Sequence, residues 1–329
     1  MVPHNRWVNR PEYEAAALRV LRSGHVGQGQ EVERLEAALA ARFGKQAACV
    51  VSSGTAALML ALHALYVQGR EGSSVDVPTY ACAALTDAAE ALGLDVTFLD
   101  IDERTLNVRA SEGPDYAPQG IFVHTYGVVG NCPGTWVEDF THAPGGGYGG
   151  SSCGSMGALS VISFGATKPL GVGAGGAVLG SFGTIERIRD RRDYDRLRGD
   201  ERFNLQLGDI YAALVLVRLE RLEAENSWRN HVARRYDEKR TPVWTGTPHT
   251  FYRYVIRVAD WREAQRHFLR YGVETINPLR MDELLHRRSS VRALPSAERV
   301  AATTLSLPIW PGMTDGEVKR VAEALESLS

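Results

Sequence analysis

The sequence has few cysteines, and this scarcity excludes small folds held together by disulfides or zinc. Its 329 residues include four cysteines, and no two of them form a CxxC pair. A chain of this length buries enough apolar surface to fold without disulfides. Zinc sites need ligands clustered at short spacing, and the sequence shows no such cluster. We therefore expect four reduced thiols and no metal site.

A long apolar run is also missing, as is a strong excess of charge. The longest nearly apolar stretch, AALMLALHALYV, has 12 residues, which is too short to span a bilayer. The polar start MVPHNRW carries no signal-peptide core. A net charge of −2 gives no reason to expect a nucleic-acid partner. These features predict a soluble, cytoplasmic protein that binds neither membranes nor nucleic acids.

What the sequence does contain is an alternation of helix and strand patterns. Two amphipathic helices are predicted at 10–24 and 31–44, and each ends in glycine. Short strands without polar–apolar alternation follow, with helices between the earlier ones. The predicted strands are 47–51, 74–78, 95–100, 120–126, 157–164 and 175–181, and the helices between them are 56–65 and 81–93. This order indicates an α/β fold with a largely parallel sheet and right-handed crossovers.

The last third of the chain has a different pattern. A long helical pattern at 210–240 leads out of the first domain. A strand at 251–258 and helices at 260–272 and 314–328 then form an α+β unit of about 100 residues, an ordinary domain size. We predict a large domain at residues 1–225 and a smaller C-terminal domain at 226–329.

The stretch SSGT, residues 52–55, is the first that could carry chemistry. It follows a predicted strand and opens a predicted helix. Backbone N–H groups at a helix N-terminus bind phosphate; Gly54 would let the anion approach closely, and the Thr55 hydroxyl could add a donor. Serine and threonine are also preferred as helix N-caps. The residues alone favour both interpretations equally.

The second stretch is EDFTHA, residues 138–143, after the predicted strand TWV. A carboxylate at the carboxyl end of a parallel strand lies where α/β sheets bind their ligands. Asp139 is therefore a candidate binding residue, and a helix-capping or solvated acid is the alternative. Asp139 with His142 could also suggest a metal site, but no third ligand is evident.

The third stretch is SFGATKPLGVGAGGAVL, residues 163–179, where Lys168 follows the predicted strand SVISF. Its neighbours are small, apolar or glycine. Partial desolvation favours the neutral amine of a lysine, which can form a Schiff base with an aldehyde. The alternative is an exposed lysine in a loop, because most lysines are exposed.

Two glycine-rich patterns are weaker candidates for a functional site. Gly171, Gly173 and Gly176 match G-x-G-x-x-G, but they lead into a predicted strand, whereas a dinucleotide fingerprint opens a helix. GGGYGG, residues 145–150, lacks the Lys-Ser/Thr of a phosphate loop and is expected to be a flexible loop.

The three chemical stretches together fit a single ligand, pyridoxal 5′-phosphate. This cofactor needs a phosphate site, an acid that keeps its pyridine nitrogen protonated, and a lysine that binds its aldehyde. The protonated ring then serves as an electron sink for a carbanion. The combination is much more specific than any of its parts.

These motifs, in this order, resemble the DegT/StrS-type aminotransferases, which are fold type I pyridoxal-phosphate enzymes that mostly aminate keto-sugars. The resemblance covers nearly the whole chain. It runs from LRSGHVGQGQEVERLEAALAARFG through VSSGTAALMLAL, EDFTHAPGG, SFGATKPLGVGAGGAVL and FNLQLGDIYAALVLVRLERL to LSLPIWPGMTDGEV. It implies a large domain with a mostly parallel, seven-stranded type of sheet between helices, and Lys168 as the catalytic Schiff-base lysine.

The resemblance also implies the other cofactor contacts. Gly54, Thr55 and Ser163 would bind the phosphate. Asp139 would pair with the pyridine nitrogen. His142 holds a position that is usually glutamine, near the ring oxygen of the cofactor.

One further contact and several departures complete the comparison. Asn204 matches an asparagine that reaches the phosphate of a neighbouring subunit, which implies a homodimer with shared active sites. Cys82 takes the place of the aromatic ring that is usually stacked on the cofactor, with Tyr80 nearby. Ile276 and Arg280 replace a tyrosine and a histidine. These departures concern substrate recognition more than cofactor binding.

The resemblance implies transfer of an amino group from glutamate or glutamine to an acceptor. The acceptor would be a nucleotide-linked keto-sugar or a keto-cyclitol. The setting would be secondary-metabolite or surface-polysaccharide biosynthesis. Two alternatives stay open from the sequence. One is a sugar dehydratase-like reaction, although relatives of that kind replace the lysine with histidine and this chain retains Lys168. The other is a regulatory protein that binds the cofactor without catalysis.

Overall fold

The protein is described from a computed structural model that covers residues 1–67, 74–108, 119–193, 203–240, 242–244, 246–288 and 292–328. Its α-helices in these ranges are α1 (Pro11–Ser23), α2 (Gln30–Phe43), α3 (Gly54–Leu62), α4 (Ala84–Glu90), α5 (Phe182–Arg192), α6 (Asp209–Asp237), α7 (Trp261–Arg270), α8 (Pro295–Thr303) and α9 (Asp315–Glu326). Its strands are β1 (Ala47–Val51), β2 (Ser74–Pro78), β3 (Asp95–Leu99), β4 (Ile121–Val123), β5 (Val137–Asp139), β6 (Gly147–Tyr148), β7 (Ser151–Ser152), β8 (Leu159–Ser163), β9 (Gly176–Gly180), β10 (Tyr254–Arg257) and β11 (Thr304–Leu307). None of the helices within the described ranges has the length and apolar character that a bilayer crossing requires.

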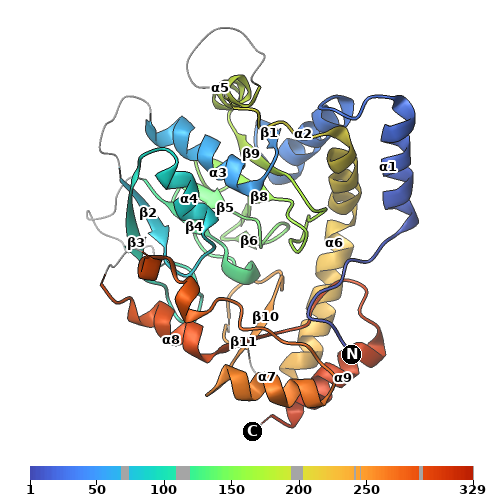
Figure 1. Cartoon of the computed structure of the whole chain (residues 1–329), viewed down its shortest axis with the longest axis vertical. Coiled ribbons are helices and arrows are strands. Elements are labelled where there is room, and N and C mark those ends of the chain that lie inside the picture. Colours follow the sequence, from blue (N-terminus) through green and yellow to red (C-terminus); the bar gives the residue numbers. More distant parts are fainter. Residues whose placement is uncertain are drawn as a thin grey trace.

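The central sheet is mainly parallel. Five strands pair in the order β1-β9-β8-β5-β4, and β2 pairs in parallel with β3. A parallel bridge between Asp76 and Gly120 joins these two sets into one seven-stranded surface. Strand β9 runs against its neighbours, β1 and β8. The predicted α/β fold with a largely parallel sheet is therefore confirmed (Figure 1).

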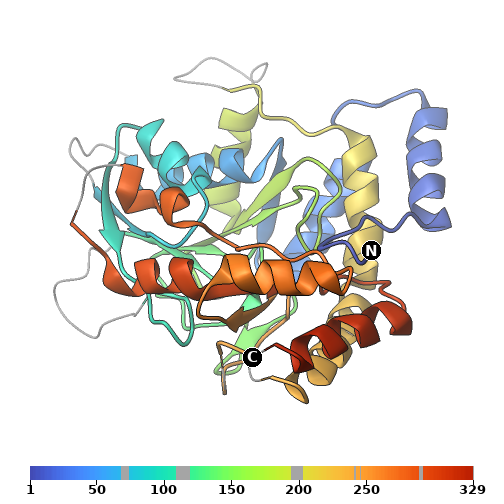
Figure 2. The ribbon, with the colours of Figure 1, turned by 60° about the horizontal axis from the view of Figure 1, so that its bottom comes forward.

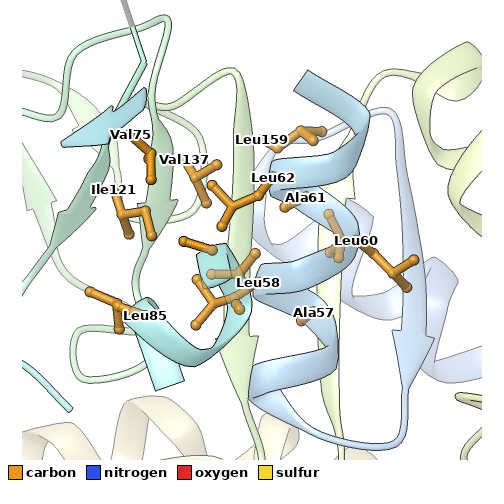
Figure 3. Close-up of a cluster of buried hydrophobic side chains, with 14 of the residues drawn as sticks. Ala57, Leu58, Leu60, Ala61, Leu62, Val75, Leu85, Ile121, Val137 and Leu159 are labelled. Atoms are coloured by element: carbon orange, nitrogen blue, oxygen red, sulfur yellow. The ribbon is translucent and has the colours of Figure 1, made fainter. Parts of the chain in front are cut away.

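Helices cover both faces of this sheet. Strand alternation explains how: in β1, Cys49 packs into the core beneath α3, α4 and α5, whereas Val50 packs into the core beneath α2 and α6. Figure 3 shows Leu58 and Leu62 of α3 directed toward Val137 of β5 and its neighbours. Burial on both faces accounts for the continuous apolar character of these strands.

The first turn of α2 is tied to the start of α6. Asp209, which is buried, accepts hydrogen bonds from the backbone N–H groups of Gly29 at 2.9 Å and Val32 at 3.1 Å. The N-terminal N–H groups of a helix lack partners within the helix, so a carboxylate placed there satisfies them. These hydrogen bonds fix the start of α6 relative to α2.

The C-terminal elements form a second core. Strands β10 and β11 pair antiparallel, and α7, α9 and the last turns of α6 pack around them. They occupy the lower part of Figure 1, and Figure 2 brings this part forward. The N-terminal segment joins this core, because the N–H of Val2 donates to the carbonyl of Gly272 at 2.7 Å. The division of the chain at residue 225 falls inside α6 and stays a prediction.

Some elements differ from those predicted. The sequence does not predict α5, because only Ile185, Ile188 and Arg192 are buried and most of the remaining residues are polar. GGGYGG is not an irregular loop: β6 and β7 form a hairpin whose turn residues, Gly149 and Gly150, both have positive φ, which glycine adopts without steric cost. The predicted strand at 120–126 is shorter than expected, because a 3-10 turn follows β4.

Candidate active site

A cavity of about 430 Å³ opens at the carboxyl ends of β5 and β8 and at the start of α3. Asp139 is the last residue of β5, and Ser163 is the last residue of β8. Parallel strands that end together create this kind of ligand-binding edge. The predicted site residues that line the cavity are Gly54, Thr55, Cys82, Asp139, His142, Ser163 and Lys168.

At one end of the cavity, the first turn of α3 lies against the end of β8. The Ser53 hydroxyl accepts a hydrogen bond from Ala56 N–H at 3.1 Å, so the N-cap interpretation is right for that residue. Gly54 touches Ser163 so closely that an added Cβ would lie 2.6 Å from the serine Cβ. Thr55 is exposed. Helix N–H groups and two hydroxyls therefore face the same space, which is a suitable arrangement for an anion.

Asp139 is a buried carboxylate on the cavity wall. Its side chain is close to fully covered, and one oxygen accepts a hydrogen bond from Thr141 N–H at 3.0 Å. Burial raises the pKa of Asp139, although the hydrogen bonds from Thr141 and the charge of Lys168 oppose this effect. A cationic N–H placed against this carboxylate would favour its charged form.

Lys168 is half-buried and its amine lies 2.8 Å from Nε2 of His142. Burial, followed by the nearby charge of Lys168, holds the pKa of His142 well below its ordinary value, so the ring is neutral. Nδ1 of His142 accepts a hydrogen bond from the N–H of Tyr126 at 3.3 Å, and the single ring proton therefore sits on Nε2. In this tautomer, Nε2–H of His142 donates to the amine of Lys168 when that amine is in its neutral form.

Two residues of the site come from the segment before β10, and the sequence does not predict their role. Tyr252 stacks on His142 with ring centres 4.4 Å apart, and Arg253 lies over the Tyr252 ring at 5.2 Å. Burial alone would raise the pKa of Tyr252, but the cations Lys168 and Arg253 outweigh it and lower that pKa. An arginine inside the otherwise strand-like stretch FYRYVIRV was the available signal for this contribution.

Cys82, in the segment between β2 and α4, also lines the cavity. Its side chain is exposed to the cavity, while surrounding protein raises the pKa of its thiol. Tyr80, two residues earlier, is buried, and the hydroxyl of Tyr126 donates to its hydroxyl at 3.3 Å. The cavity wall therefore holds a thiol at the position where the resemblance implied an aromatic ring.

Glu138 does not belong to the cavity. Strand alternation turns it to the other side of β5, where it is fully buried and accepts a hydrogen bond from His124 at 3.1 Å. His124, Glu138 and Cys153 place ligand-type atoms within 4.8 Å of one another. The oxygens of Glu138 already accept hydrogen bonds from further donors, namely Gly154, Met156, Gly157 and Ser160. This arrangement is that of a structural carboxylate.

Asn204 lies apart from the other predicted residues. It is exposed on the segment that precedes α6, and it does not line the cavity of its own chain. A contact with the phosphate site of a second copy stays a prediction.

Comparisons with known proteins agree with this architecture. The chain matches the model of the DegT/DnrJ/EryC1/StrS aminotransferase family over residues 9–115 and 135–326. It is 27% identical, over 96% of each chain, to the UDP-2-acetamido-2-deoxy-3-oxo-D-glucuronate aminotransferase of Pseudomonas aeruginosa. Among solved structures, the sugar aminotransferase CalS13 of Micromonospora echinospora has a TM-score of 0.88 at 25% identity, covering 99% of this chain and 100% of that one. DesV of S. venezuelae has a TM-score of 0.86 at 27% identity, covering 96% and 93%.

Proposed function

The chain belongs to the DegT/DnrJ/EryC1/StrS aminotransferase family and is an aminotransferase of fold type I, and we propose that pyridoxal 5′-phosphate is its cofactor and a keto-sugar its amino acceptor. The resemblance seen in the sequence is thus confirmed for family, fold and reaction type. The observation that supports the cofactor is the convergence of a helix N-terminus, a buried carboxylate and a lysine on one cavity.

The residues present fit this cofactor. The cavity of about 430 Å³ is within the usual size range of small-molecule sites. Gly54, Thr55 and Ser163 would hold the phosphate, because their N–H and hydroxyl groups face the cavity. The buried carboxylate of Asp139, whose burial disfavours an uncompensated charge, would hold the pyridine nitrogen. Lys168 would bind the aldehyde, with His142 and Cys82 beside the ring.

The protein's own groups supply nucleophilic and proton-transfer chemistry. When bound, pyridoxal phosphate supplies an electron sink. Lys168 contributes an amine that acts first as a nucleophile and then as the base and acid that moves a proton at Nζ. His142 holds that amine through its Nε2–H, and Tyr126 fixes the tautomer of His142. The tyrosines at 80, 126 and 252 exclude water from this region.

The amino acceptor is proposed by likeness to the relatives. The Pseudomonas aeruginosa relative is named for a UDP-linked 3-oxo sugar acid, and CalS13 is named as a sugar aminotransferase. We therefore favour a nucleotide-linked keto-sugar, with a keto-cyclitol as the alternative and glutamate or glutamine as the amino donor. Dehydratase-like chemistry is less well supported, because the lysine is retained next to His142.

We also propose that the enzyme is a homodimer with shared active sites. Asn204 is exposed and does not line its own cavity. Apolar side chains of α1, Leu18 and Leu21, are exposed, as is Tyr211 at the start of α6. Helices α1 and α6 contact each other, so a second copy of the chain that packs on this pair of helices would cover these groups.

The cofactor assignment is tested by replacing Lys168. The Lys168→Ala variant should lack the visible absorbance of lysine-bound pyridoxal phosphate and should have no turnover, because Lys168 is the lysine that lines the cavity within the described chain. Lys319→Ala changes an exposed lysine of α9 and should behave as the wild type. L-Glutamate should bleach the wild-type absorbance. Turnover by Lys168→Ala would refute the assignment.

A further inference from the structure

A smaller recess of about 140 Å³ adjoins the active-site cavity. Tyr252 and Arg253 line both spaces, so they form the wall between the recess and the surroundings of Lys168. The recess is closed by residues from the two ends of the chain, including His4 and Trp310. Among the described residues, two arginines line it and no aspartate or glutamate does.

Arg229, on α6, is the first of the two arginines. Its side chain is buried with 4% exposure, and its Nε has no hydrogen-bond partner among the described residues. Its Nη1 donates to Asn226 at 3.3 Å. Burial lowers the pKa of Arg229 to about 10, although Glu225 opposes the effect. Glu225 itself pairs with Arg218 at 3.3 Å, so the charge of Arg229 is poorly compensated.

Arg253 is the second arginine, and its backbone is fixed. Its N–H donates to the carbonyl of Tyr126 at 3.2 Å, and its guanidinium lies over the rings of Tyr252 at 5.2 Å and Tyr126 at 5.7 Å. Its Nη1 is 3.5 Å from Nε2 of His4. Burial and the charge of Arg253 lower the pKa of His4 to about 3, so this histidine is a neutral neighbour.

We propose that Arg229 and Arg253 form a subsite for a carboxylate group of a substrate that reacts beside Lys168. The inference rests on the proposed aminotransferase function. A guanidinium binds a carboxylate through two parallel hydrogen bonds, and two poorly compensated guanidiniums make an anion favourable. The recess is too small for a nucleoside diphosphate. Ile309 and Trp310 give it apolar walls suited to a short carbon chain.

The position of the recess links this carboxylate to the reacting atoms. The amine of Lys168 lies 5.5 Å from the centre of the Tyr252 ring, and the guanidinium of Arg253 lies 5.2 Å from the same centre. Both cationic groups therefore flank the same ring, and a molecule held at Lys168 lies next to the wall that carries Arg253. The carboxylate comes either from the amino donor or from a sugar-acid acceptor, and the two sources are separated by experiment.

The test compares wild type with Arg253→Gln, both loaded with pyridoxal phosphate. Normal visible absorbance of the variant would show that the cofactor site is intact, so failure of the subsite is distinguishable from failure of the proposed function. Calorimetric titration should show that succinate binds to the wild type. Its affinity for the variant should be lower by a factor of about ten or more. Succinamide, the uncharged analogue, should not distinguish the two proteins.

Kinetic measurements identify the source of the carboxylate. A higher KM for L-glutamate in Arg253→Gln, with kcat little changed, assigns the subsite to the donor. A higher KM restricted to a keto-uronate acceptor assigns it to the acceptor. Arg253→Lys should recover part of the affinity, because lysine keeps the positive charge. The recovery should be incomplete, because lysine lacks the two parallel N–H donors of a guanidinium. Arg266→Gln, on the exposed face of α7, controls for net charge. Equal succinate affinity and unchanged KM values in Arg253→Gln would overturn the proposal.

Discussion

A hydrogen atom is the largest side chain that position 54 admits. Gly54 opens α3 directly against Ser163, and a methyl group there would lie 2.6 Å from one serine atom and 2.8 Å from another. Neither side can yield easily, because Ser163 ends a central strand and its Oγ accepts a hydrogen bond from Gly165 N–H at 3.2 Å. The close approach places the hydroxyl of Ser163 beside the N-terminal N–H groups of α3.

We predict that Gly54→Ala lowers the unfolding free energy by about 1–3 kcal/mol, the usual cost of overpacking. It should also weaken binding of pyridoxal phosphate, because α3 and β8 move apart. Urea unfolding of the cofactor-free protein and titration with the cofactor measure the two effects. Gly316→Ala is the matched control: nothing lies within 4 Å of its added methyl group, and its stability should be equal or slightly higher. Wild-type unfolding of Gly54→Ala would contradict the close contact.

Residues of the site differ in how far sequence predicts them. Lys168, Asp139 and Ser163 lie just after or at the end of apolar strands, so the strand pattern is enough to infer their shared location at one sheet edge. Tyr252 and Arg253 could not be placed in this way, since they belong to the C-terminal segment and no local pattern gives the packing of that segment on the sheet. The 2.8 Å contact between His142 and Lys168 likewise depends on tertiary structure.

At the scale of elements, β5 shows how one strand serves two purposes. Adjacent residues point to opposite faces, so Asp139 lines the cavity and Glu138 joins His124 to the loop that leads to β8. Burial alone would raise the pKa of Glu138. The hydrogen bonds from His124 and from backbone N–H groups outweigh burial and hold that pKa below its ordinary value of 4.5.

The lowered pKa of Glu138 determines the direction in which the stability of the fold changes with pH. A carboxylate with a lower pKa in the folded state stabilises the fold above its ordinary pKa, and this stabilisation is lost as the pH falls through the folded value. We predict that Glu138→Gln lowers the unfolding free energy by about 1–3 kcal/mol at pH 7, because an amide NH₂ opposes the donors that surround Glu138. The difference from wild type should shrink as the pH falls below 4.5.

Urea unfolding at a series of pH values measures this difference. Glu33→Gln, at an exposed position of α2, serves as the control and should change the stability little at any pH. A Glu138→Gln penalty that stays constant down to about pH 3 would show that the charge of Glu138 is not the source of its contribution.

Elements with a continuous apolar run could be predicted closely, and elements with a weak hydrophobic pattern could not. The strands at 47–51 and 74–78 have the bounds predicted from their apolar runs, because burial on both faces leaves a continuous signal. Helix α5 buries a narrow stripe under many charges, and the β6–β7 hairpin consists mostly of glycine and serine. Their structure is set by turn geometry and by contacts with distant residues, which local pattern does not encode.

At the scale of the molecule, α6 connects the two cores. Its first turns pack beneath the sheet, with Ala212 and Val215, and its last turns pack in the C-terminal core, with Val232 and Tyr236. One continuous helix resists bending between them, since each internal residue keeps its backbone hydrogen bond. Arg229 lies on this helix between the two cores, which keeps the recess in a fixed relation to the cavity.

The proposed homodimer gives the last prediction. Light scattering after gel filtration should give twice the chain mass, and Asn204→Ala should keep that mass while weakening pyridoxal-phosphate binding in both sites. Leu21→Glu, at an exposed position of α1, should reduce both the mass and the cofactor affinity, because a buried charge disfavours association. Arg22→Glu, next to it on the same helix, controls for charge. A monomeric wild type with full cofactor affinity would exclude shared sites.

The docking of the N-terminal segment on the C-terminal core has a consequence for biosynthesis. Val2 bonds to Gly272, His4 contacts Ser306, and the indole of Trp310 donates to the carbonyl of Pro3 at 3.1 Å. The N-terminal segment therefore cannot dock in its final place until the residues that it contacts, from Gly272 to Trp310, have been made. A nascent chain that stops short of residue 300 already carries every cavity-lining residue from Ser53 to Leu279. The smaller recess, lined by Arg229 and Arg253, still lacks its lining residues from beyond position 300.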